Sequence, residues 1–188
     1  MGGRFWQRLK NLIKDDEEIF EPRRRDPRVV ARVLMVCMGN ICRSPTAEAV
    51  FMHRAARAGL APYLEIDSCG THAGHSGEPP DRRSQQAAAQ RGYSMEGLRA
   101  RRLEVEDLDY FDYILVMDED NLQRVLSRCS RPEQKAKVRL LLDFAPELGE
   151  REVPDPYYGG RSGFDRVLNL IEAGTDGLIA VIRERHGL

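Results

Sequence analysis

One short stretch of the chain brings a cysteine, an arginine and a serine together between an apolar run and a helix start. It follows residues 33–36 and reads Cys37-Met38-Gly39-Asn40-Ile41-Cys42-Arg43-Ser44. The first N–H groups of a helix lack intrahelical partners, and together with the helix dipole they attract anions. Arg43 adds a planar guanidinium that can bind two phosphate oxygens at once. Because helix N-termini and cations favour the thiolate form of cysteine, Cys37 is predicted to attack the phosphorus of a bound phosphoryl group.

The other residues of this loop suit a tight turn around an anion. Gly39 allows a ligand to approach the backbone closely, and Asn40 tolerates a left-handed conformation. We expect Ser44 to cap the following helix and Pro45 to occupy its first position. The Ser44 hydroxyl could also donate a hydrogen bond to the Cys37 sulfur, which would make the thiolate a better leaving group in a second step.

Covalent phosphoryl transfer also needs an acid for the leaving oxygen, and the candidate is Asp155. Prolines on both sides of it favour a stiff, extended loop, which reads Val153-Pro154-Asp155-Pro156-Tyr157-Tyr158. A rigid loop can hold one carboxylate over a pocket. Asp155 would donate a proton in the first step and accept one from water in the second. This chemistry requires no metal or cofactor.

Apolar segments that alternate with helical ones predict a parallel α/β fold that positions these residues. We expect strands over residues 33–37, 64–67, 113–117 and 138–142, and helices over 46–58, 82–91, about 119–128 and 162–184. Asp81 and Asp118 would cap two of these helices, and Gly174 and Gly177 are weak points of the last. The pattern predicts a four-stranded parallel sheet with helices on both faces, of Rossmann-like type. Cys37 would lie at the carboxyl end of a strand, where such sheets bind ligands.

The composition excludes several other classes of protein. The chain has 188 residues, 41% of them hydrophobic, which suits one compact domain. A formal net charge of −1 gives no global attraction to nucleic acid. The four cysteines include no CxxC pair, which argues against a structural zinc site. Because no signal peptide or membrane-spanning run is found and a thiolate needs a reducing compartment, we expect a cytoplasmic protein.

Residues 1–28 form an extension that differs from the catalytic domain expected at residues 29–188. Basic residues, an acidic run and further arginines follow one another in it. Apolar residues recur at helical spacing, namely Phe5, Trp6, Leu9, Leu12 and Ile13. An amphipathic helix over residues 4–14 could touch a membrane surface or a partner. Such patterns more often belong to a helix packed on its own domain or to a terminal tail, and the sequence leaves these alternatives open.

These motifs resemble those of the low molecular weight protein tyrosine phosphatases over about residues 30–185. The loop at 37–45 is similar to the phosphate-binding loop of that family, and the segment 153–160 is similar to its general-acid loop. Further similar segments follow in the family's order at residues 67–71, 77–81, 111–118 and 163–164. Two distant catalytic motifs in the right order make the resemblance specific. It implies a phosphotyrosine phosphatase I fold and hydrolysis of phosphotyrosine through a phosphocysteine intermediate.

The resemblance also implies roles for individual residues. Cys37 would be the nucleophile, Arg43 the phosphate clamp, and Asp155 the general acid and base. The remaining substrate-binding residues would be Met38, Gly39, Asn40, Ile41, Cys42, Ser44, Tyr157 and Tyr158. The implied partners are phosphotyrosine proteins, with a bacterial tyrosine kinase of polysaccharide export as one candidate.

Several positions qualify what the resemblance implies. The second loop cysteine of many members forms a reversible disulfide with the nucleophile, so Cys42 has either that role or the role of a buried thiol. Gly74 stands where many members carry an aromatic residue, just before the histidine that aligns with His75. Leu98 stands where many carry a histidine that supports the loop asparagine. Ile41 replaces the threonine of related arginine phosphatases, which favours phosphotyrosine.

Two other functions are alternatives to a phosphatase. An arsenate reductase of related fold needs further cysteines on a mobile segment, and Cys69 and Cys129 do not form the expected close pair. A catalytically silent phosphopeptide-binding module would lack the nucleophile or the acid, and both are present here. The sequence therefore favours a phosphatase over either alternative.

Overall fold

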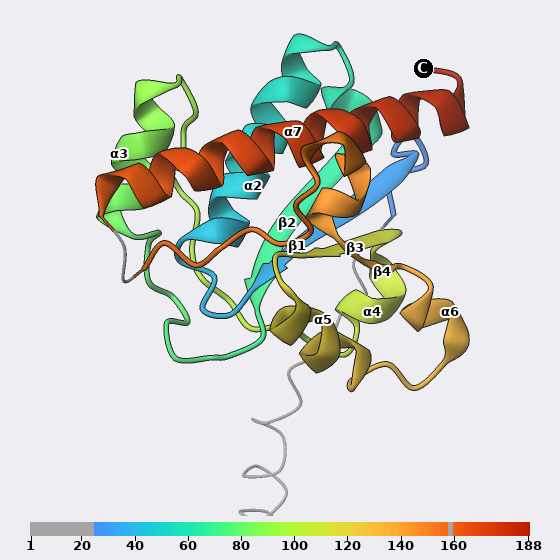
Figure 1. The fold of residues 1–188 in the computed structure, drawn as a ribbon. Helices are drawn as coiled ribbons and strands as arrows, with labels where there is room; N and C mark the ends of the chain where they lie inside the picture. The colour runs from blue at the N-terminus through green and yellow to red at the C-terminus, as the bar shows by residue number, and fades with distance from the viewer. Residues whose placement is uncertain (1–24, 158–159) are drawn as a thin grey trace, which may run out of the picture.

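The centre of the molecule is one four-stranded sheet with the strand order β2-β1-β3-β4. A computed structural model describes residues 25–157 and 160–188 (Figure 1). The strands are β1 (Ala31–Cys37), β2 (Leu64–Gly70), β3 (Tyr113–Val116) and β4 (Val138–Leu140), and every neighbouring pair is parallel. The predicted four-stranded parallel fold is confirmed. Because β1 is a central strand, its last residue, Cys37, lies at the middle of the carboxyl edge.

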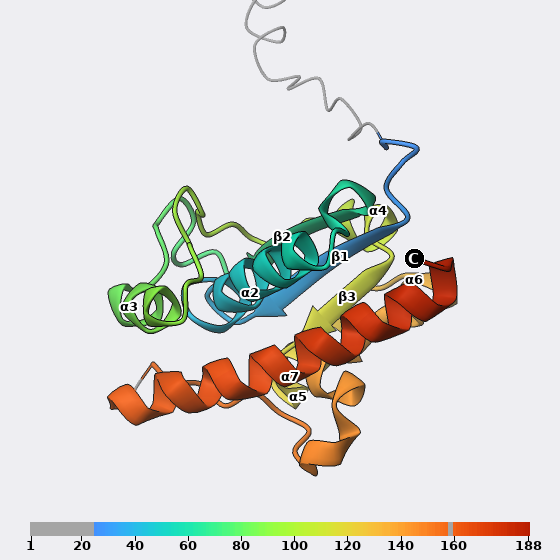
Figure 2. The same ribbon diagram turned by 90° about the horizontal axis from the view of Figure 1, so that it is seen from above.

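Helices cover both faces of this sheet, as the sequence predicts. They are α2 (Arg43–Arg57), α3 (Arg82–Gln90), α4 (Asp107–Tyr110), α5 (Glu119–Leu126), α6 (Pro132–Lys135) and α7 (Arg161–His186). Val33 and Met35 of β1 belong to a buried cluster with α2, α3 and α7. Leu34 and Val36 belong to a second cluster with α4 and α5. Alternate side chains of β1 therefore enter two cores, and α7 runs alongside α2 in the first of them (Figure 2).

Two of the predicted helix starts are confirmed by their capping hydrogen bonds. The Asp81 carboxylate accepts from the N–H of Arg83 at 2.8 Å at the start of α3. The Asp118 carboxylate accepts from the N–H of Asn121 at 2.7 Å at the start of α5. The helices α4 and α6 were not predicted, because one turn is too short to show a hydrophobic period. The same holds for the 3-10 turns η1 (Ala61–Tyr63), η2 (Leu141–Phe144) and η3 (Pro146–Leu148).

The fourth strand is shorter than predicted, and two glycines of α7 lie against the segment that follows it. The strand ends at Leu140, and the chain turns into η2 instead of continuing to residue 142. A Cβ atom on Gly177 would lie 1.7 Å from the Phe144 carbonyl oxygen, and one on Gly174 would lie 2.8 Å from Leu141 Cγ. The helix nevertheless runs unbroken through Gly174 and Gly177. They let the η2 backbone pack directly against α7.

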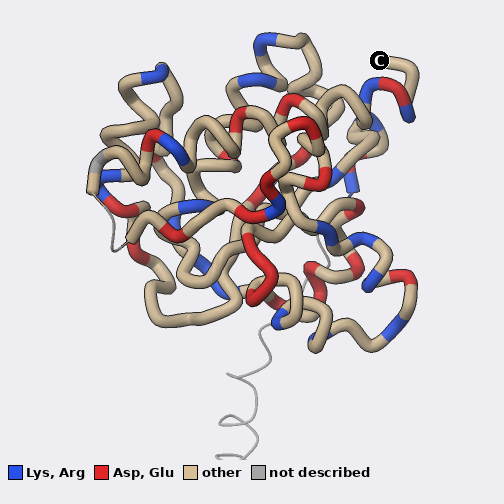
Figure 3. The backbone as a smooth tube through the Cα atoms, viewed as in Figure 1, with Lys and Arg blue, Asp and Glu red and all other residues tan. Residues whose placement is uncertain are grey.

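Part of the predicted organisation lies outside the described residues. This applies to the amphipathic segment 4–14, to most of the extension 1–28, and to Tyr158. Among the described helices, none combines the length and the apolar character that a membrane crossing requires. Figure 3 shows Lys and Arg interspersed with Asp and Glu along the described chain.

Candidate active site

The loop between β1 and α2 is wound around the sulfur of Cys37. Asn40 adopts the predicted left-handed conformation, with a φ of 56°, and its backbone N–H donates to Cys37 Sγ at 3.3 Å. The chain that follows β2 holds this loop from the side. Thr71 N–H donates to the Cys37 carbonyl at 2.9 Å, and His72 N–H donates to the Met38 carbonyl at 3.0 Å. Cys37 thus sits in a tight turn at the carboxyl end of its strand, as predicted.

Ser44 does not cap α2, contrary to the prediction. The helix begins at Arg43, Cys42 occupies the N-cap position, and the Cys42 side chain makes no capping hydrogen bond. Ser44 therefore lies inside the first turn and faces back into the loop. Its Oγ is 3.1 Å from Cys37 Sγ and 3.3 Å from the Cys69 carbonyl oxygen. The Ser44 hydroxyl is therefore within hydrogen-bonding distance of the Cys37 sulfur, as its predicted role as a donor to the thiolate requires.

The side chain of Asn40 is held from three directions behind the loop. Its Nδ2 donates to Ser44 Oγ and to Ser68 Oγ, each at 2.9 Å. Its Oδ1 accepts from the backbone N–H of Arg101 at 2.9 Å. These contacts supply the support that the leucine at position 98 cannot give. Because a left-handed residue other than glycine is costly, this brace stabilises the conformation in which the Asn40 N–H donates to the sulfur.

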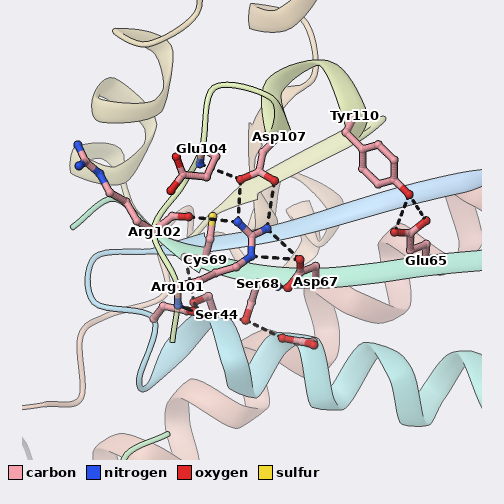
Figure 4. Close-up of polar contacts among 12 residues, drawn as sticks. Ser44, Glu65, Asp67, Ser68, Cys69, Arg101, Arg102, Glu104, Asp107 and Tyr110 are labelled. Carbon is pink, nitrogen blue, oxygen red and sulfur yellow. Dashed lines mark hydrogen bonds and ion pairs between the residues drawn. The ribbon is translucent and has the colours of Figure 1, made fainter. Parts of the chain in front are cut away.

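Arg101 is itself fixed by two carboxylates, and this cluster was missed by the sequence reasoning. Figure 4 shows its guanidinium between Asp67 and Asp107. Arg101 Nη2 lies 2.9 Å from Asp67 Oδ2, and its Nη1 lies 2.8 Å from Asp107 Oδ2. Asp107 is 3% exposed, so its charge needs such a partner. The cluster joins Arg101 to Asp67, which is 34 positions earlier in the chain, so no local sequence pattern predicts it.

A buried carboxyl group ends the hydrogen-bonded chain that starts at the nucleophile. Ser68 Oγ, which accepts from Asn40, donates to Glu48 Oε2 at 2.6 Å. Glu48 is 8% exposed. Burial raises the pKa of Glu48 to about 7, the hydrogen bond from Ser68 opposes this, and the charges of Asp67 and Arg101 have smaller and opposite effects. Glu48 is therefore partly protonated near neutral pH.

The free energy of unfolding should fall as this carboxyl group ionises. The unfolded chain, with an ordinary Glu pKa of 4.5, gives up the proton before the folded protein does. The favourable contribution of the neutral Glu48 carboxyl group to the free energy of unfolding is complete below about pH 4.5. It decreases as the pH rises from there and is lost once the pH passes about 7. Between about pH 5 and pH 8, urea unfolding should show a loss on the order of 3 kcal/mol. Glu48→Gln should remove this part of the pH dependence, and identical pH profiles for the two proteins would contradict the assignment.

Arg43 connects the phosphate-binding loop to the general-acid loop. Its Nη1 donates to Asp118 Oδ2 and, at 3.1 Å, to the Val153 carbonyl. Its Nη2 lies 3.1 Å from Asp155 Oδ2. Burial alone would lower the pKa of Arg43, but Cys37 and the two carboxylates raise it overall. Asp118, predicted only as a helix cap, thus also orients the guanidinium.

Asp155 is held at the mouth of the site by its own loop. Val153 N–H donates to the Met117 carbonyl at 2.7 Å, which ties the loop to the end of β3. Tyr157 N–H donates to Asp155 Oδ1 at 3.0 Å. The side chain of Asp155 remains 33% exposed, so it can exchange protons with water. One oxygen is thus fixed by the loop backbone, and the other faces Arg43.

These residues line one cavity of about 190 Å³. Its lining residues are Cys37, Met38, Gly39, Ile41, Cys42, Arg43, His75, Asp155 and Tyr157. The predicted residues Asn40 and Ser44 instead support the loop from behind. His75 is an addition to the predicted site, and with Tyr157 it forms walls of the cavity. Gly74 borders open space. Among the described residues other than its chain neighbours, none has a heavy atom within 4 Å of the position that a Cβ on Gly74 would occupy.

The four cysteines of the chain are free thiols in the structure. Cys42 lines the cavity with Cys37, and burial is the main reason that the pKa of its thiol is raised to about 12. Cys69 and Cys129 are buried in the second core cluster. Within residues 25–157 and 160–188, no group of three potential His, Cys, Asp or Glu ligands could hold a metal ion.

Comparisons with known proteins agree with this geometry. The family model described as low molecular weight phosphotyrosine protein phosphatase matches residues 32–187. A low molecular weight protein-tyrosine-phosphatase of Streptomyces coelicolor is 42% identical over 156 residues, which cover 82% of this chain and 94% of that protein.

Solved structures resemble the fold closely. The crystal structure of YfkJ from Bacillus subtilis is 38% identical, covers 83% of this chain and 96% of its own, and has a TM-score of 0.79. The crystal structure of DARP, an arginine phosphatase of Drosophila, is 30% identical, covers 79% and 96% of the two chains, and has a TM-score of 0.74. The chain belongs to the low molecular weight phosphotyrosine protein phosphatase family.

Proposed function

We propose that this phosphatase hydrolyses phosphotyrosine through a phosphocysteine intermediate. In the first step the Cys37 thiolate attacks phosphorus, the S–P bond forms, the P–O bond to tyrosine breaks, and protonated Asp155 gives its proton to the leaving oxygen. In the second step the Asp155 carboxylate takes a proton from water, whose oxygen attacks phosphorus. The S–P bond then breaks, which releases inorganic phosphate and restores the thiolate.

The single observation that carries this proposal is the shared cavity. A nucleophile, a phosphate clamp and an acid line the same space of about 190 Å³. Arg43 and the N–H groups of the loop would bind the phosphoryl oxygens and stabilise the charge that they carry in the transition state. Asp155 would protonate the leaving oxygen from the general-acid loop, where its carboxylate lies 3.1 Å from Arg43.

Ser44 should contribute mainly to the second step. With its hydroxyl 3.1 Å from the sulfur, it can donate a hydrogen bond to the thiolate that leaves phosphorus. Ser44→Ala should therefore slow hydrolysis of the phosphocysteine more than its formation. Rapid-quench kinetics should show a larger pre-steady-state burst and a lower kcat, with kcat/KM less affected. A fall in kcat/KM as large as that in kcat would contradict this role.

The substrate class is best tested by a direct comparison. Ile41 lines the cavity where related arginine phosphatases carry threonine, and its apolar side chain suits an aromatic substrate. Tyr157 is the aromatic residue that Ile41 shares this cavity with, apart from His75. Activity should be measured side by side on phosphotyrosine, phosphoarginine and arsenate, with a phosphorylated bacterial tyrosine kinase as a protein substrate. Preference for phosphotyrosine is expected, and turnover of either other compound in its place would contradict the proposal.

We also infer redox sensitivity and a cytoplasmic location. Cys37 and Cys42 are free thiols that line one cavity. A peroxide would oxidise the Cys37 thiolate to a sulfenic acid, which could then condense with the Cys42 thiol, release water and form a disulfide. Reduction by a dithiol would restore activity. Such a nucleophile functions in a reducing compartment.

A further inference from the structure

An arginine outside the cavity makes contacts to the general-acid loop that the mechanism above does not use. Arg83 lies in the first turn of α3, and its Nη1 donates to the carbonyl of Tyr157 at 2.9 Å. Its guanidinium carbon lies 5.3 Å from the centre of the Tyr157 ring and 5.0 Å from that of Phe164. The side chain thus contacts both the general-acid loop and the start of α7.

The same guanidinium is fixed on its other edge by Asp81. Arg83 Nε and Nη2 donate to the two Asp81 carboxylate oxygens, at 3.0 and 2.8 Å. Asp81 is joined in turn to the phosphate-binding loop, because its N–H donates to the Ile41 carbonyl at 2.7 Å. A planar fork held at one edge presents its remaining N–H in a defined direction. Arg83 therefore links the position of the Tyr157 carbonyl to the position of the phosphate-binding loop.

The acid lies between two fixed points of its loop. Upstream, Val153 is tied to the end of β3 and to Arg43. Downstream, the carbonyl of Tyr157 is tied to Arg83, while the N–H of the same residue holds Asp155 Oδ1. If the hydrogen bond from Arg83 is lost, the Tyr157 N–H that orients the carboxylate is held less firmly. The distance from the Asp155 carboxyl group to the leaving oxygen depends on the position of this N–H.

We propose that Arg83 is a positioning residue for Asp155, which acts by anchoring the Tyr157 backbone. The inference rests on the proposed function, since it assigns Arg83 to the proton-transfer part of that mechanism. Arg83 does not line the cavity, and its side chain is 46% exposed. Its replacement should therefore leave the core and the phosphate-binding loop intact. Because kcat/KM reports the first step, loss of the anchor should lower kcat/KM only for substrates whose leaving group needs a proton.

The test is the dependence of kcat/KM on the pKa of the leaving phenol. Arg83→Gln should lower kcat/KM for phosphotyrosine roughly 10-fold, and it should change kcat/KM by less than about 2-fold for an aryl phosphate whose phenol leaves without protonation. Arg83→Lys keeps the charge but not the planar fork, so it should recover little of the loss. The control is Arg82→Gln, which removes a neighbouring exposed arginine and should leave both substrates unaffected.

A double-mutant cycle with Asp155→Ala separates positioning from a general structural effect. In the Asp155→Ala background, Arg83→Gln should cause no further loss on phosphotyrosine, because the group that it positions is gone. An equal loss on both aryl phosphates, a loss that persists without Asp155, or full recovery by lysine would overturn the inference. If Asp155→Ala itself shows no dependence on the leaving group, the proposed function fails, whatever Arg83 does.

Discussion

Replacing Cys37 by serine is expected to abolish turnover of phosphotyrosine while the protein still binds phosphate. A serine hydroxyl is not ionised near neutral pH and leaves phosphorus poorly, so neither step can proceed at a measurable rate. The anion-binding groups stay in place, since Arg43 and the loop N–H groups are unchanged. Steady-state kinetics would measure the first effect, and calorimetric titration with inorganic phosphate would measure the second.

The chain offers a control for this substitution. Cys129 is a free thiol buried in the second core cluster and is not among the residues that line the cavity. Cys129→Ser should keep the activity of the folded protein, even if it lowers the melting temperature. Measurable turnover by Cys37→Ser would contradict the role of this sulfur as nucleophile.

The second largest effect is expected from Asp155→Ala. Without its carboxyl group, the leaving oxygen departs as an anion, and water in the second step has no base. Phosphotyrosine, whose phenol has a high pKa, should lose roughly 10²–10⁴ in rate. The loss in kcat/KM should be much smaller for an aryl phosphate with a strongly acidic phenol, because that oxygen leaves without a proton.

The comparison between the two substrates serves as its own control. A variant that is partly unfolded would lose activity on both by the same factor, whereas a missing acid affects them unequally. Equal losses would therefore count against Asp155 as the acid. A further check is phosphate binding, which should remain, since Asp155 contributes a carboxylate and not a phosphate donor to the cavity.

Much of the fold follows from local patterns in the sequence. The apolar run before Cys37 predicts a buried strand, and the structure shows its side chains alternating between two cores. The capping aspartates at 81 and 118 mark helix starts because each accepts a hydrogen bond from its own first turn. Asparagine is one of the few residue types other than glycine that tolerate a left-handed conformation, and Asn40 adopts it.

What could not be predicted depends on contacts between distant segments. Serine is a common N-cap residue, but the N-cap of α2 is Cys42, two residues before Ser44, and the Ser44 hydroxyl lies beside the Cys37 sulfur instead. The brace on Asn40 comes partly from the backbone of Arg101, whose place is set by its own carboxylate partners. Glycine is unfavourable inside a helix, but at position 177 the Phe144 carbonyl oxygen occupies the space that a Cβ would need.

The central claim is that phosphorus becomes bonded to the sulfur of Cys37 during each turnover. The most direct measurement is rapid acid quenching of the wild-type protein with an excess of an aryl phosphate, followed by mass spectrometry of the intact chain and its peptides. We predict that one phosphoryl group appears within the first turnover, is located on Cys37, and disappears when the substrate is exhausted. Turnover without any phosphorylated protein, or with the phosphoryl group on another residue, would contradict the account.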